Sequence, residues 1–231
     1  MGTAVVAEAP AADPRLAALA HALAPKGLIA RGGFHPTAED GLDAATVVMI
    51  GNAGPALWRV FEGVAARDTD PHPMDRWTRA VMEDVAALFG ARALYPFGGP
   101  PYHPFQRWAM RAEAVHPSPL GLLIHPDYGL WHAYRAALLF RERLALPPRD
   151  RRPSPCESCV ARPCLSTCPV GAFDAETGYD VPACTAHIRS PAGTDCLDRG
   201  CRARHACPVG STFTYDDAQS AFHMGAFERA R

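Results

Sequence analysis

The first 155 of the 231 residues contain no cysteine, whereas eight cysteines lie between positions 156 and 207. This uneven distribution excludes the scattered disulfides of a small secreted fold. The N-terminus also lacks the basic segment of a signal peptide and carries Glu8 and Asp13 instead. We therefore expect a cytoplasmic protein, in which thiols stay reduced and a group of cysteines binds metal.

Long apolar runs and an excess of one charge are also missing. The longest apolar stretch, Thr46–Trp58, is interrupted by Gly51, Asn52 and Gly54 and is too short to cross a bilayer. The net charge is −1 and the pI is about 6.8, so the overall charge does not attract DNA or an anionic membrane. Lys26 is the only lysine among 23 basic residues, a bias typical of a high-GC bacterial genome. DNA and membranes are accordingly not expected partners.

Apolar residues make up 48% of the chain, which is enough for a folded core. The run Ala45–Ile50 predicts a buried strand, and Met74–Phe89 has the spacing of an amphipathic helix. Further helices are predicted for Pro14–Leu23, Pro55–Ala66, Phe105–Ala114 and Ala218–Arg229, and a second strand for Ala93–Phe97. Leu120–Ile124 and Trp131–Phe140 fit either two strands or a strand and a helix.

These patterns predict two domains. Residues 1–10 form a loose lead, and residues 1–145 form an α/β (α+β) domain. The segment 146–155, rich in proline and arginine, predicts a linker that opens a second, cysteine-rich domain over 146–231.

The cysteines fall into two groups that end alike. The first group reads Cys156-x2-Cys159-x4-Cys164-x3-Cys168, and the second reads Cys184-x11-Cys196-x4-Cys201-x5-Cys207. Each group ends in Cys-Pro-Val-Gly, at 168–171 and at 207–210. Repeated Cys-Pro endings are typical of ferredoxin-like modules that bind two [4Fe–4S] clusters, because soft thiolates are the ligands of iron–sulfur clusters. We therefore expect the second domain to be a small two-cluster ferredoxin-like module with a C-terminal helix.

In such modules the last cysteine of one group binds the cluster of the other group. Applied to this sequence, the rule predicts two ligand sets. The first set is Cys156, Cys159, Cys164 and Cys207, and the second is Cys168, Cys184, Cys196 and Cys201. Two four-thiolate zinc sites would use the same eight residues, although only Cys156 and Cys159 form the C-x2-C pair that zinc sites usually repeat. Zinc and disulfides are the alternatives to iron and sulfide.

Two stretches of the sequence resemble the cobalamin-dependent epoxyqueuosine reductases of tRNA modification. The segment from Leu122 to Trp131, Leu-Leu-Ile-His-Pro-Asp-Tyr-Gly-Leu-Trp, is similar to the Leu-Leu-Ile-x-Pro-x-Tyr-Gly-x-Trp segment of that family. The cysteine groups resemble its region of two clusters. The resemblance extends over about residues 40–210 and is clearest over 120–210.

The resemblance implies an N-terminal domain like those of nitroreductases and cobalamin-processing proteins, with the clusters facing a bound corrinoid. The family's Asp-Ser-x-Pro segment, which supplies its proposed acid, is replaced here by the residues Phe97–Phe105. The chain also stops before the C-terminal repeats that help the family to hold tRNA. We therefore expect a substrate other than epoxyqueuosine, and tRNA is the less favoured partner.

A cofactor pocket is predicted on the N-terminal domain, bounded by Phe97–Phe105 and Leu122–Trp131. Aromatic residues with polar tips suit the wall of a flat cofactor such as cobalamin. The candidate cofactor-binding residues are Tyr102, His103, Tyr128 and Trp131. Ordinary core and rim packing is the alternative role for these four side chains.

Three classes of function are consistent with the sequence. In the first, two [4Fe–4S] clusters pass electrons to a cofactor or small-molecule substrate in the N-terminal domain, which makes the protein an oxidoreductase. In the second, the protein is a ferredoxin-like electron carrier or adaptor that docks on a partner enzyme without chemistry of its own. In the third, the clusters are structural or sense their surroundings. We favour the reductase, with a flavodoxin or ferredoxin reductase as its electron donor, because a carrier does not need the large N-terminal domain.

Overall fold

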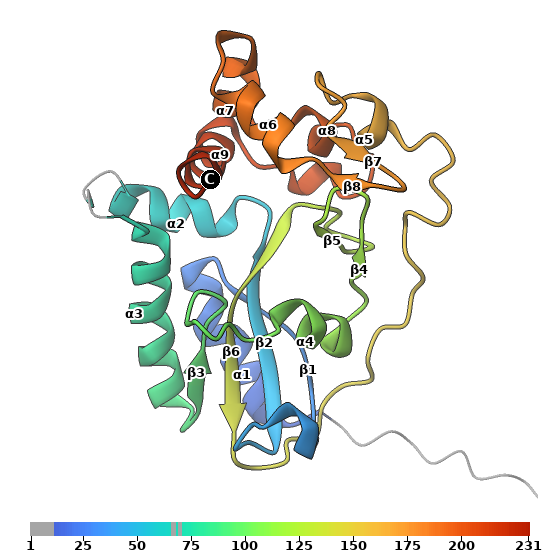
Figure 1. Cartoon of the computed structure of the whole chain (residues 1–231). Helices are drawn as coiled ribbons and strands as arrows, with labels where there is room; N and C mark the ends of the chain where they lie inside the picture. Colours follow the sequence, from blue (N-terminus) through green and yellow to red (C-terminus); the bar gives the residue numbers. More distant parts are fainter. Residues whose placement is uncertain (1–11, 66–67, 69–70) are drawn as a thin grey trace, which may run out of the picture.

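The structure is a computed structural model that describes residues 12–65, 68 and 71–231. It is a mixed α/β fold, as predicted, built on one four-stranded antiparallel sheet (Figure 1). The strands are β1 (Ile29–Phe34), β2 (Thr46–Ala53), β6 (His132–Phe140) and β3 (Arg92–Leu94), in that spatial order. The predicted lead over residues 1–10 lies outside the described residues.

The central strand β2 is buried on both faces of the sheet. Val48 and Ile50 face the helices α1 (Pro14–Leu23), α2 (Ala56–Ala65) and α3 (Pro73–Leu88), while Val47 and Met49 face α4 (Phe105–Ala112). A strand covered on both faces reads as a continuous apolar run, which explains why this segment could be recognised. Of the helix predicted over Pro55–Ala66, the last residue lies outside the described residues.

Strand β1 was not predicted from the sequence. Its residues Ile-Ala-Arg-Gly-Gly-Phe lack the alternation of a strand, because two glycines stand where apolar side chains would continue the pattern. The pairing of β1 with β2 also shifts register between Ala30 and Gly33, as at a bulge. The ambiguous segments both form strands: β6, and the short β5 (Leu123–Ile124), which pairs with β4 (His116–Pro117).

Beyond β6 the chain forms neither helix nor strand over residues 143–154 and then enters the cysteine-rich region. This region consists of short helices and strands that lie beyond one end of the sheet (Figure 1). They are α5 (Pro163–Ser166), β7 (Phe173–Asp174), β8 (Gly178–Tyr179), α6 (Val181–Ile188), α7 (Thr194–Arg199) and α8 (Arg202–His205). The described residues also include 3-10 turns at 24–26, 38–40, 191–193 and 211–213.

The last helix, α9 (Asp217–Arg229), connects the two regions. Phe222 on α9 lies 5.3 Å from Trp58 and 5.5 Å from Phe61 of α2, measured between ring centroids. Helix α9 also packs against α7 of the cysteine-rich region. The domain boundary at 145/146 stays a prediction. Although α9 follows this boundary in the sequence, it contributes Phe222 to the core of the sheet-bearing region. None of the described helices has both the length and the apolar character that a bilayer span requires.

Candidate metal centres and the adjoining cavity

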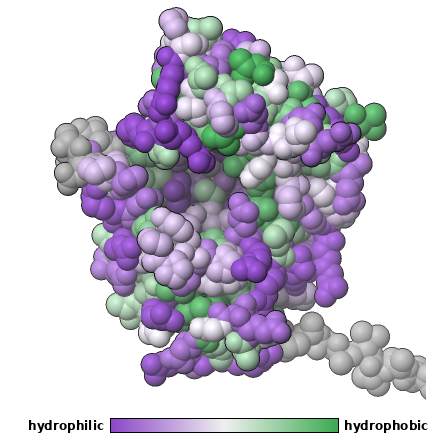
Figure 2. All heavy atoms as spheres, viewed as in Figure 1, coloured by the Kyte–Doolittle hydropathy of each residue, from purple (hydrophilic) through white to green (hydrophobic). Residues whose placement is uncertain are grey.

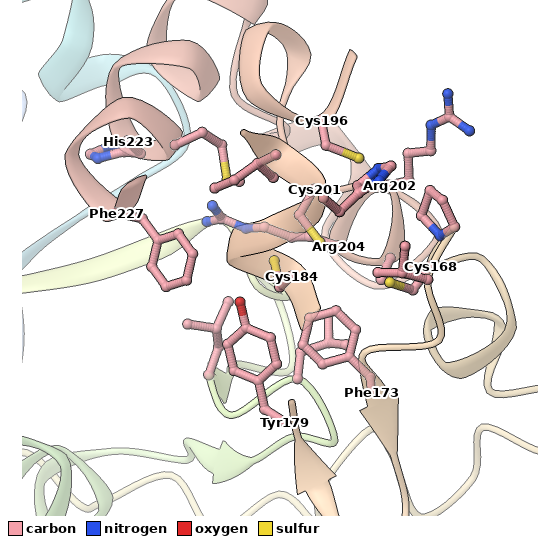
Figure 3. A pocket seen from close by; sticks show the side chains of 18 residues that line it. Cys168, Phe173, Tyr179, Cys184, Cys196, Cys201, Arg202, Arg204, His223 and Phe227 are labelled. Carbon is pink, nitrogen blue, oxygen red and sulfur yellow. The ribbon is translucent and has the colours of Figure 1, made fainter. Parts of the chain in front are cut away.

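All eight cysteines are free thiols, and they surround two separate cavities. Cys168, Cys184, Cys196 and Cys201 line a cavity of about 260 Å³, with the rings of Phe173 and Tyr179 along another side (Figure 3). Cys156, Cys159, Cys164 and Cys207 line the second cavity, which is about 20 Å³. These are the same two sets that the crossed rule predicts from the sequence.

The fold brings the distant cysteines together through two short helices. Helix α5 carries Cys164, and α8, which packs against α5, ends two residues before Cys207. The apolar core between them consists of Leu120, Ile124, Leu130, Phe173 and Ala203. Cys156, Cys164, Cys168, Cys201 and Cys207 pack against this core, so cysteines of both sets share one support.

The environment of the thiols combines burial with hydrogen bonds from the backbone. Burial raises the pKa of Cys156, Cys164, Cys196, Cys201 and Cys207. Hydrogen bonds from backbone N–H groups oppose this rise at Cys196, Cys201 and Cys207. The N–H of Ala172 points at Cys168, 3.3 Å from its Sγ. Such donors favour a thiolate, which is the form that binds metal.

The donor sets fit iron–sulfur clusters, because each offers four soft sulfur ligands around a cavity. In the part of the chain that is described, no three His, Cys, Asp or Glu side chains converge closely enough for one metal ion.

A third cavity lies between the cysteine-rich region and the sheet, where the molecular surface is hollowed (Figure 2). Its volume is about 410 Å³, in the range of small-molecule sites. Strand β3 pairs only with Ala137–Leu139 of β6, so β3 does not cover residues 132–135 of that strand, and this uncovered part forms one wall. Leu122, Arg204 and His223 line both this cavity and that of the second cysteine set, so the two adjoin.

A buried polar network stands behind this wall. Arg31, 2% exposed, forms an ion pair with Glu113 at 2.8 Å, and the hydroxyl of Tyr134 donates a hydrogen bond to the same carboxylate. Burial raises the pKa of Glu113, although the charge of Arg31 opposes the rise. His132 Nε2 lies 3.0 Å from the carbonyl oxygen of Leu123 and therefore carries the proton, while burial lowers its pKa. His132 is thus neutral where it lines the cavity.

The four predicted cofactor-binding side chains do not line one cavity. Tyr102 is 67% exposed beside α3, and His103 stacks on Trp108 at 5.5 Å. Tyr128 stacks on His125 at 4.3 Å, and Trp131 is 1% exposed, with His205 and Tyr215 against its ring. Tyr128 and Trp131 are not free to line a cavity, because their rings fill the contact between the sheet-bearing and the cysteine-rich regions.

The cavity is lined instead by residues that the sequence did not single out as a site. Arg135 comes from β6, Arg204 from α8 and His223 from α9. In the sequence, Arg204 stands among arginines and acidic residues that are typical of a solvated surface, and Arg152 and Arg202 do pair with exposed carboxylates. Only the spatial approach of three elements distinguishes Arg204, so no local signal could have revealed it.

No protein-family model and no curated protein matches this chain. Among solved structures, epoxyqueuosine reductase from Streptococcus thermophilus matches with a TM-score of 0.51 at 14% identity, over 85% of this chain and 65% of that chain. The chain has the fold of epoxyqueuosine reductases.

Two further structures of epoxyqueuosine reductases also match the fold of this chain. The enzyme from Bacillus subtilis, with its catalytic loop swung out of the active site, matches with a TM-score of 0.51 at 14% identity, over 87% of this chain and 65% of that chain. A reductase with an epoxyqueuosine-modified tRNA stem loop matches with a TM-score of 0.50 at 14% identity, over 88% and 66% of the two chains. This chain thus spans about two thirds of the length of these reductases.

Proposed function

We propose that the protein is an oxidoreductase that binds two [4Fe–4S] clusters and passes electrons to a ligand in the cavity beside them. The observation that carries this proposal is the gathering of eight cysteines, up to 51 positions apart in the sequence, into two fours around separate cavities. When bound, such clusters accept and release single electrons at low potential. Two centres in one small region favour relay over a purely structural role.

The arrangement also gives the relay a direction. The first set lies beside Val160, which is 97% exposed next to Cys159, so a partner protein can approach this side. The second set adjoins the 410 Å³ cavity through Leu122, Arg204 and His223. We propose that an electron donor, a flavodoxin or a ferredoxin reductase, docks at the first set and that the reducible ligand binds at the second.

The resemblance to epoxyqueuosine reductases adds a corrinoid as candidate cofactor. The 410 Å³ cavity meets a wider one of about 910 Å³ at Arg135 and His223, and together they offer a cleft for a large flat ligand. His132 and Tyr134 would orient such a ligand at the sheet, and Leu122 and Leu130 would exclude water from one side. A corrinoid would accept electrons singly at its cobalt.

The proposal is tested on protein prepared without oxygen. We expect a brown protein with about eight iron and eight sulfide per chain, whose broad absorption bleaches with dithionite. A colourless protein with two zinc ions per chain would overturn the proposal. Anaerobic titration with cob(II)alamin, followed by its absorption spectrum, tests the corrinoid. Loaded clusters without any bound corrinoid or reducible ligand would favour the electron carrier instead.

A second measurement addresses RNA. One solved structure with this fold includes a tRNA stem loop, so tRNA is a candidate ligand of this chain as well. We expect no shift of a tRNA anticodon stem loop in a binding gel, because the net charge is −1 and acidic residues alternate with arginines along the cysteine-rich region. A shift that persists at physiological salt would contradict this expectation and make tRNA a candidate substrate.

A further inference from the structure

The 410 Å³ cavity has an unbalanced charge. Two guanidinium groups, those of Arg135 and Arg204, line it, and no Asp or Glu stands among the described residues of its wall. The other polar side chains of the wall are Gln106, Tyr134, Tyr215 and two histidines. Both arginines are half-buried, and a cation that is partly removed from water without a carboxylate in contact is costly. A bound anion reduces that cost.

Arg135 has few partners for a partly buried cation. Its Nε donates to Asn52 Oδ1 over 3.4 Å, and among the described residues no carboxylate lies within 4.0 Å of its guanidinium. Burial lowers the pKa of Arg135, while Asp75 and Tyr215 act against this shift from a distance. The guanidinium keeps its charge, because the ordinary pKa of arginine is very high.

Arg204 is held more rigidly. Its guanidinium carbon lies 4.4 Å from the ring centroid of Trp131 and 4.7 Å from that of Tyr215, and one terminal nitrogen donates to the carbonyl of Leu130 at 2.6 Å. Its Nε is buried and has no hydrogen-bond acceptor in the described part of the chain. A planar cation held in this way is suited to a carboxylate or phosphate.

The rest of the wall is apolar or neutral. Phe105, Leu122, Leu123 and Leu130 provide an apolar surface for the body of a ligand. His223 adds a ring whose Nε2 is buried without a partner among the described residues, and burial lowers its pKa to about 3. An apolar pocket with two fixed cations selects a molecule that has an organic body and an anionic end.

We propose that this cavity binds the carboxylate or phosphate group of a small organic ligand between Arg135 and Arg204. The inference rests on the proposed function for the role of that ligand, which would be the electron acceptor or a part of it. The binding site itself can be tested without any redox activity. The anionic group can come from a free substrate or from the phosphodiester of a corrinoid.

The test uses cluster-loaded protein and three probes of similar shape: phenyl phosphate, benzoate and phenol. Calorimetry should show that both anions bind at least about tenfold more tightly than phenol, because hydrogen bonds between charged groups are stronger than those of a neutral hydroxyl. Arg135→Met and Arg204→Met should each lower the affinity for phenyl phosphate and benzoate about tenfold. Arg107→Met is the matched control, since Arg107 is exposed on α4 next to Gln106 of the wall and should leave binding unchanged.

Equal binding of phenol and phenyl phosphate, or anion binding that survives both substitutions, would overturn the inference. Iron content and circular dichroism establish that each variant is folded and loaded, and Arg135→Lys should recover part of the affinity if charge is what matters. Iron content measured on the same samples also tests the proposed function separately: zinc in place of clusters would end that proposal, while anion binding would still support this one.

Two corrinoids identify the source of the anion. Cobinamide lacks the phosphodiester that cobalamin carries. If Arg135→Met weakens the binding of cobalamin but not that of cobinamide, the site holds the phosphodiester of a corrinoid. If phenyl phosphate binds equally well to protein with and without cobalamin, the site holds a separate substrate. Either result supports the anion site.

Discussion

The sheet-bearing region and the cysteine-rich region are stabilised in different ways. The first has helices of up to 16 residues and two clusters of buried apolar side chains, one on each face of the sheet. The second has four helices, α5 to α8, of 4 to 8 residues, strands of 2 residues and one small apolar cluster. Short helices are marginal alone, and no disulfide joins the cysteines. The second region therefore needs an additional source of stability, which metal binding can supply.

Removal of the clusters should affect only one of the two regions, and it is the largest effect we expect. Chelation of iron should remove the binding free energy of the clusters from the cysteine-rich region, where metal binding and folding are coupled. Amide hydrogen exchange should then speed up greatly in α5–α8, while β2 and β6 keep their protection. Equal protection of both regions before and after chelation would contradict the comparison.

Single cysteine variants should sharpen the comparison within the second region. Cys207→Ala should abolish the cluster of Cys156, Cys159 and Cys164, although these lie more than forty positions earlier. Cys168→Ala should instead abolish the cluster near Cys184. Each variant should keep about four of eight iron atoms, as measured by iron analysis and electron paramagnetic resonance. Loss of the opposite cluster in either variant would disprove the crossed arrangement.

The two glycines of the repeated Cys-Pro-Val-Gly segment offer a matched pair. A Cβ on Gly210 would lie 2.3 Å from the carbonyl carbon of Tyr128, where the two regions touch, whereas Gly171 has no atom within 4 Å of that position. Both have positive φ, 71° and 58°, so both alanine variants carry the backbone cost of about 1 kcal/mol. Gly210→Ala should lose about 2 kcal/mol more than Gly171→Ala in chemical denaturation, because the backbones must separate. Equal losses would show that the contact contributes nothing.

Acid should destabilise the sheet-bearing region through one buried histidine. Burial lowers the pKa of His125 to about 4, with Nδ1 accepting a backbone hydrogen bond from Asp127 at 3.0 Å. The unfolded chain takes up this proton near pH 6.5 and the folded chain does not, so the free energy of unfolding should fall as pH drops from 6.5 to 4. The slope should be at most about 1.4 kcal/mol per pH unit for this residue.

Denaturant unfolding at several pH values checks this prediction. His125→Gln should flatten the dependence, and His21→Gln, a change at an exposed position of α1, should not. A slope that is the same in the wild type and in His125→Gln would show that this histidine does not titrate between the two states.

The sequence by itself determined the elements and groupings that depend on near neighbours. The cap Asp13 accepts a hydrogen bond from the N–H of Arg15 at the start of α1, and the apolar run of β2 is buried on both faces, because caps and periodicity are local properties. The repeat of Cys-Pro-Val-Gly likewise predicted which four cysteines would share each cavity. Binding of clusters in those cavities stays a prediction.

Only the tertiary structure decided where a ligand can bind. Arg135, Arg204 and His223 lie on three different elements, β6, α8 and α9. They line one cavity because β3 pairs with only part of β6 and because α9 packs back against the sheet-bearing region. Trp131 and Tyr128 are residue types that suit a pocket wall. In the structure, however, Trp131 is buried between the two regions and Tyr128 stacks on His125. Such roles follow from long-range packing, which the order of residues along the chain does not display.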